Sequence, residues 1–94
     1  MRDAGRVTSD SPPEPDWYDL IVTLGNPDGK PELLRPPRRA RVTTTNYRGE
    51  TVVLELDVVA RAPGHVLVAQ PREGREPWNA WIRSSDAIPL DVRR

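Results

Sequence analysis

The stretch that decides the fold is residues 51–61, which read TVVLELDVVAR. Every even-numbered position in it is apolar, from Val52 to Ala60, whereas most odd-numbered positions are polar or charged, Glu55 and Asp57 among them. Side chains of a strand point alternately to its two faces. A period of two over eleven residues therefore predicts one long strand with a single buried face.

A hairpin is predicted on the upstream side of this strand. Residues 40–46 can pair with it through a three-residue loop, 47–49, in which Gly49 supplies the left-handed conformation that such loops need. The resulting register sets Val42 opposite Leu54, with both side chains on the buried face.

A second hairpin is predicted downstream, where residues 62–65 read APGH and place Pro and Gly as a type II turn requires. Pairing through this turn sets Ala60 opposite Leu67 and Val58 opposite Ala69. The two hairpins bury the same face of the central strand, so their registers agree with each other.

The same pairing predicts an apolar patch on the opposite face, made of Val59, Val66 and Val68. A sheet with one buried face should not present such a patch to water. Either the sheet curls so that this end is covered, or a partner covers it. Barrel closure is the simpler of these two interpretations.

The N-terminal part has a different composition. Residues 1–16 are polar and contain three prolines near their end, so we predict a flexible tail, which is either a leader or a partner-binding arm that uses residues 12–15. A β-rich run at 19–24 and Leu33-Leu34 are predicted to form a short hairpin within residues 17–37. A single domain is thus expected over residues 17–94, with its main body at 38–91.

The C-terminal residues 78–90 read WNAWIRSSDAIPL, which predicts an aromatic strand, a one-turn 3₁₀ helix and a very short last strand. Together with the long central strand and its hairpins, residues 38–91 resemble the SH3-like family of small β-barrels. The resemblance implies an all-β fold, a small barrel of five to six antiparallel strands. The motifs of peptide-binding SH3 domains are absent, because Trp17-Tyr18-Asp19 and Ser84-Ser85-Asp86 stand in their places. Proline-rich ligands are therefore not implied, and the fold alone selects no function.

Composition excludes several chemistries. The 94 residues contain no cysteine and one histidine, so disulfides, cysteine-based metal sites and His-rich sites are ruled out, and no cofactor is expected.

The formal net charge is zero, with an acidic N-terminal third and a slightly basic remainder. Thirteen of the 14 basic residues are arginine, which is typical of a GC-rich genome, bacterial or phage. No signal peptide or membrane span is recognisable, which predicts a cytoplasmic protein without membrane contact.

A protein-binding surface is predicted around the aromatic residues. Trp78 and Trp81 are three positions apart in one strand and should face opposite sides, and we expect Trp81 to be the buried one. Exposed tryptophan, tyrosine and arginine are the side chains most often found at the centres of protein interfaces. The predicted surface joins one tryptophan, a charged 71–77 loop and the tip of the upstream hairpin: Trp78, Arg72, Arg75, Tyr47 and Arg48.

Two other functions remain open from the sequence. Nucleic acid could bind a stripe made by Arg38, Arg39 and Arg41, although acidic residues such as Glu55 lie close enough in sequence to pair with it. A Ser85–His65–Asp86 hydrolase site would need hydrogen bonds that a sequence cannot show, and no nucleophile elbow is present. The sequence therefore favours a non-catalytic protein–protein interaction or assembly component that binds a partner or itself, with no small-molecule substrate evident.

Overall fold

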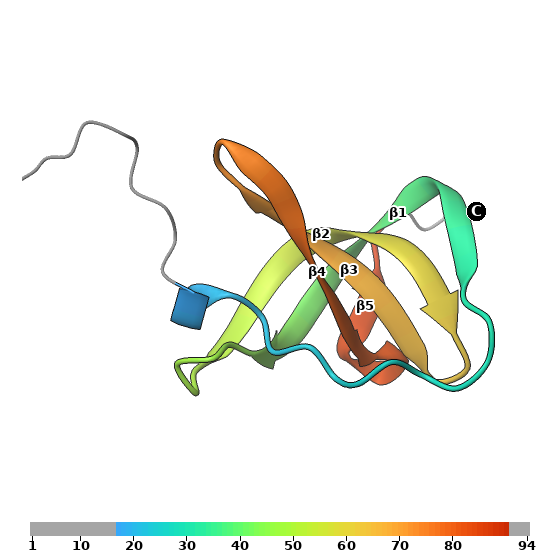
Figure 1. Cartoon of the computed structure of the whole chain (residues 1–94), viewed down its shortest axis with the longest axis horizontal. Helices are drawn as coiled ribbons and strands as arrows, with labels where there is room; N and C mark the ends of the chain where they lie inside the picture. The colour runs from blue at the N-terminus through green and yellow to red at the C-terminus, as the bar shows by residue number, and fades with distance from the viewer. Residues whose placement is uncertain (1–16, 91–94) are drawn as a thin grey trace, which may run out of the picture.

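The computed structural model of the chain describes residues 17–90 (Figure 1). The predicted tail, residues 1–16, and the last four residues lie outside this range. The described elements, in chain order, are η1 (Trp17–Asp19), β1 (Glu32–Thr45), β2 (Thr51–Ala62), β3 (His65–Arg72), β4 (Arg75–Arg83), η2 (Ser84–Asp86) and β5 (Ala87–Pro89).

The strands form one antiparallel sheet in the order β4-β3-β2-β1-β5, so the all-β prediction is confirmed. The predicted closure is not observed, because β4 and β5 are the two edges of the sheet and share no pairing in the described part of the chain. The sheet is nevertheless strongly twisted, and its strands wrap around a common interior (Figure 1).

The upstream hairpin has the predicted register. Val42 pairs with Leu54, and Gly49 has a φ of 89° in the turn between β1 and β2. The turn is closed by two backbone hydrogen bonds, from the Asn46 N–H to the Glu50 carbonyl at 3.0 Å and from the Gly49 N–H to the Asn46 carbonyl at 2.9 Å.

The downstream hairpin is correct near its turn and wrong further along. Ala60 pairs with Leu67 as predicted, but Val58 pairs with Val68 rather than with Ala69, because the register shifts at Val59. An extra residue in one strand displaces the remaining pairs by one position, and such a displacement exchanges the two faces.

This bulge removes the apolar patch that the sequence predicted. Val68 is fully buried in the core, and Val66 packs against it. Two of the three patch valines therefore belong to the interior, and the patch needs neither barrel closure nor a partner to cover it.

The predicted hairpin within residues 17–37 is also wrong. Leu33 pairs with Ala60, so Leu33 and Leu34 belong to β1 and extend the β1–β2 pairing. The register is irregular between Leu33 and Arg38, where the two consecutive prolines lack amide donors, and β1 bends sharply there (Figure 1).

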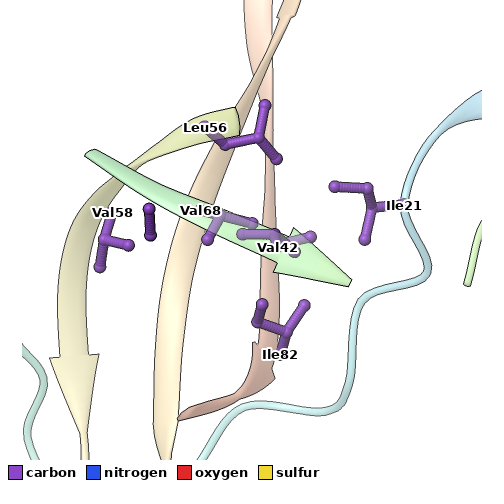
Figure 2. Close-up of a cluster of buried hydrophobic side chains, with 8 residues drawn as sticks. Ile21, Val42, Leu56, Val58, Val68 and Ile82 are labelled. Atoms are coloured by element: carbon purple, nitrogen blue, oxygen red, sulfur yellow. The ribbon is translucent and has the colours of Figure 1, made fainter. Parts of the chain in front are cut away.

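Residues 20–24 instead lie between the end of β1 and β4. The Val22 N–H donates to the Thr45 carbonyl at 3.0 Å, and the Leu24 N–H donates to the Trp81 carbonyl at 2.9 Å. Ile21, which forms an isolated bridge with Asn46, is fully buried and points toward the core from this segment (Figure 2). The segment thus fills part of the space that barrel closure would have occupied.

The core lies on the concave face of the sheet and takes side chains from every long strand (Figure 2). Its buried members are Ile21, Ala40, Val42, Leu56, Val58, Val68, Ala80 and Ile82. Trp78 packs against this cluster and is partly buried, whereas Trp81 is 8% exposed and does not belong to it. The expected burial of Trp81 is confirmed.

The segment 71–77 is not the loop that the sequence predicted. β3 runs to Arg72 and β4 starts at Arg75, with Gly74 at a φ of 77° in a tight turn. This β3–β4 hairpin projects beyond the rest of the sheet (Figure 1).

Candidate functional site

Two side chains from neighbouring strands hold Ile21 in place. The Gln70 Oε1 accepts from the Ile21 N–H at 2.9 Å, and the Trp78 Nε1–H donates to the Ile21 carbonyl at 2.8 Å. Gln70 and Trp78 are directly opposite each other in β3 and β4. Trp78 is therefore a structural residue as well as part of the surface.

This attachment places η1 beside the β1–β2 turn, where four aromatic rings meet. The ring centroids are 5.5 Å apart for Trp17 and Tyr18, 6.2 Å for Trp17 and Tyr47, and 6.5 Å for Tyr47 and Trp78. We call these four residues the aromatic cluster. Trp17 is 68% exposed and Tyr47 is 40% exposed, so one side of the cluster faces solvent.

Arg48 fastens η1 to the turn. Its Nη2 is 2.8 Å and its Nε is 3.1 Å from the Asp19 Oδ1, and its guanidinium carbon lies 3.9 Å from the centroid of the Tyr18 ring. The hydrogen bonds to Asp19 raise the pKa of Arg48 above its ordinary value, so the side chain keeps its charge. The Arg48 side chain thus joins Tyr18 and Asp19 of η1 to the β1–β2 turn.

The structure brings together three of the five residues predicted for partner binding. Tyr47 contacts Trp78, and Arg48 lies beside them through Tyr18. Arg72 and Arg75 lie at the tip of the β3–β4 hairpin, where the Arg72 Nε donates to the Glu76 carbonyl at 2.8 Å.

Sequence reasoning missed Trp17 and Tyr18 as members of this site. Two adjacent aromatic residues in front of an apolar run were a visible signal. Their relation to the turn was not visible, because it depends on a contact between segments about thirty residues apart in the chain.

The arginines predicted for nucleic-acid binding have separate surroundings. Arg39 pairs with Asp57 at 3.2 Å and Arg41 lies 3.7 Å from Glu55, in each case directly across from β1 to β2. The side chain of Arg38 makes no hydrogen bond or ion pair with the residues that the structure describes. The three side chains therefore form no continuous positive stripe.

A groove of about 510 Å³ lies beside the bent half of β1. Its floor is aliphatic and includes Ala40, Val58 and Val66, and its edge carries Arg35 and Arg38. It shares no lining residue with the aromatic cluster.

The three residues of the alternative hydrolase site, Ser85, His65 and Asp86, do not form a hydrogen-bonded site. The His65 Nδ1 lies 2.9 Å from the Pro63 carbonyl oxygen, and within residues 17–90 no hydrogen bond links His65 to Ser85 or Asp86. The described residues also contain no group of three histidine or acidic side chains that could hold a metal ion. None of the helices described here is long and apolar enough to cross a membrane.

Comparison with known proteins assigns no family. No family model, no curated protein and no solved structure matches this chain.

Proposed function

We propose that the protein is a non-catalytic protein–protein interaction or assembly module whose contact surface is the aromatic cluster. The observation that carries this proposal is the 68% exposure of Trp17 within a chain of four touching rings. A tryptophan that serves only to stabilise the fold would be expected to bury most of its ring.

Physical reasons support a binding role for such a cluster. Tryptophan and tyrosine bring a large contact area and a polar group to an interface. Rings that already touch one another lose little conformational freedom on binding, and two of them are also fixed, Tyr18 by Arg48 and Trp78 by its hydrogen bond to the Ile21 carbonyl. The cluster is thus suited to form the central part of an interface.

We also propose that the fold is a relative of the SH3-like barrels. The strand order β4-β3-β2-β1-β5 supports this, as does the one-turn η2 between β4 and β5. Residues 20–24 hydrogen-bond to Thr45 at the end of β1 and to Trp81 in the edge strand β4, so they bridge two strands of the open sheet that do not pair with each other.

Nucleic-acid binding has less support. Arg39 and Arg41 are each paired with a carboxylate, which lowers the positive potential along β1. The aromatic cluster could stack on unpaired bases. Nuclease treatment of the lysate therefore separates binding of nucleic acid from binding of a protein.

The test is capture of binding partners from a lysate of the native host. Tagged wild-type chain, Trp17→Ala, Tyr47→Ala and the control Val53→Ala would be incubated with nuclease-treated lysate, and retained proteins would be identified by mass spectrometry. Val53 is 59% exposed on β2, so its variant removes a comparable exposed apolar side chain outside the cluster.

We expect one stoichiometric protein, or the chain itself, to be retained by wild type and by Val53→Ala and lost by both cluster variants. Sedimentation of the purified chain identifies self-association. Retention of the same proteins by all four chains, or recovery of nuclease-sensitive material alone, contradicts the proposal.

A further inference from the structure

The groove beside β1 has a floor made of aliphatic side chains. Ala40 and Val58 are buried there, and Val66 and Ala87 are partly buried and pack against the core. Leu33, which also lines the groove, is 60% exposed. An apolar side chain of a ligand could therefore contact Leu33 and the floor without any rearrangement of the sheet.

The edge of the groove carries an excess of positive charge. Arg61 donates to Glu32 at 3.0 Å and Arg39 pairs with Asp57 at 3.2 Å, so these two arginines are compensated. Arg35 and Arg38 are both exposed, and their side chains have no charged or hydrogen-bonded partner in the described part of the chain. Two guanidinium groups at the edge of the groove are therefore available to an anionic ligand.

We propose that this groove binds an acidic segment of a partner protein that carries an aliphatic side chain. Carboxylates of the segment would pair with Arg35 and Arg38, and its aliphatic side chain would lie against Leu33 and the floor. Guanidinium groups bind carboxylates through two parallel hydrogen bonds, which fixes the orientation of the segment as well as attracting it.

The lining favours a peptide over the other anionic polymers. Single-stranded nucleic acid is held by stacking of its bases on aromatic rings. The residues that line the groove include no aromatic ring, because the rings of this chain lie in the aromatic cluster or on β4. The volume of about 510 Å³ is in the range of sites that enclose a small ligand, about 300–1,000 Å³. Such a volume suits a few side chains of a peptide.

This proposal goes beyond the proposed function and does not depend on it. The groove residues that carry it come from β1, β2, β3 and β5, and none of them belongs to the aromatic cluster. Variants of either surface can therefore be tested without altering the other.

The test begins with selection of random twelve-residue peptides displayed on phage against the full-length chain. Selected peptides would be synthesised with a fluorescent label, and their dissociation constants measured by anisotropy. The double variant Arg35→Glu/Arg38→Glu removes the proposed charges. Arg41→Glu/Arg83→Glu is the control with the same charge change on exposed residues outside the groove. Circular dichroism would be used to check that both variants are folded.

We expect selected peptides to contain Asp or Glu next to Leu, Ile or Val. Their affinity should fall at least tenfold in Arg35→Glu/Arg38→Glu and less than threefold in the control. Leu33→Ser, which keeps the charges, should weaken binding at least threefold. In the wild-type chain labelled for NMR, the amide shifts should centre on Leu34, Arg38 and Val66.

Three results would overturn the proposal. The first is that no peptide is selected, or that the selected peptides lack acidic residues. The second is equal binding by Arg35→Glu/Arg38→Glu and wild type. The third is tighter binding of a twelve-nucleotide oligothymidylate than of any selected peptide, with loss in the same double variant, which would assign the groove to nucleic acid.

Discussion

Asn46 is the one polar residue that is buried among residues 17–90, and its contacts explain the shape of the β1–β2 turn. Its Oδ1 accepts from the N–H groups of Arg48 and Glu50, both at 3.0 Å, and its Nδ2 donates to the Glu50 carboxylate at 3.3 Å. One amide side chain thus satisfies two backbone donors that the turn leaves unpaired. This turn presents Tyr47 and Arg48.

Asn46→Ala should destabilise the protein by about 2 kcal/mol, because two backbone donors near a buried site lose their acceptor. The free energy of unfolding would be measured by urea titration. Asn79→Ala is the matched control, since Asn79 is exposed on β4, and it should change stability by less than about 0.5 kcal/mol. Equal effects of the two substitutions would show that the side chain of Asn46 does not stabilise the turn.

Trp78 has two roles that a single substitution can separate. Trp78→Phe keeps an aromatic ring against Tyr47 and removes the hydrogen bond to the Ile21 carbonyl. We expect a loss of about 1 kcal/mol and faster hydrogen exchange at the Ile21 and Val22 amides, measured by NMR. Unchanged exchange at both amides would mean that this bond does not hold the segment. Loss of binding in a Trp78 variant is therefore ambiguous, and for this reason the binding test uses Trp17 and Tyr47.

At the scale of elements, the turns follow from individual glycines. Gly49 has a φ of 89°, a conformation that residues with a Cβ adopt at a cost of about 1–2 kcal/mol. No atom lies within 4 Å of a Cβ built on Gly49, so the backbone conformation alone decides the cost.

Gly49→Ala should therefore lower the free energy of unfolding by about 1–2 kcal/mol. Gly25→Ala is the control, because Gly25 has equal space around it and no positive φ. It should be neutral or slightly stabilising, since alanine restricts the unfolded chain. Thermal and urea unfolding of both variants provide the comparison, and a Gly49→Ala chain as stable as Gly25→Ala would refute the assignment of strain.

The elements also show which features a sequence can and cannot predict. β2 was predictable because a period of two is a local property, and its upstream register followed from the length of a short loop. The bulge at Val59 was not predicted, because the apolar patch of Val59, Val66 and Val68 that it produces in the sequence pattern is equally consistent with a curled sheet or a bound partner. Residues 19–24 had the composition of a strand, but composition does not specify the partner. Their contacts with Thr45 and Trp81 join parts of the chain that the sequence keeps far apart. For the same reason the sequence did not predict that Trp17 and Tyr18 lie beside the β1–β2 turn, and it did not predict the groove.

At the scale of the whole molecule, residues 20–24 connect β1 to the edge strand β4, which do not pair with each other in the open sheet. They bond to Thr45 at the end of β1 and to Trp81 in β4, and Leu20 and Ile21 are buried. The sheet thus depends on a segment outside its own strands to cover the core. The aromatic cluster depends on the same segment, because it carries Trp17 and Tyr18.

A chain that starts at residue 25 should consequently be unstable. Loss of a buried Ile side chain alone costs about 2–5 kcal/mol, and a domain of this kind has a total stability of about 5–15 kcal/mol. We expect the urea midpoint of residues 25–94 to fall by more than half, with loss of the far-ultraviolet strand signal at modest urea.

Residues 17–94 serve as the control. This chain retains every element that the structure describes, so it should keep the midpoint of the full-length protein. A synthetic peptide of residues 15–24, added in excess to residues 25–94, should restore part of the lost stability, because it returns Ile21 to the core. A truncated chain with an unchanged midpoint would show that the sheet is stable on its own and that residues 20–24 only carry the aromatic cluster.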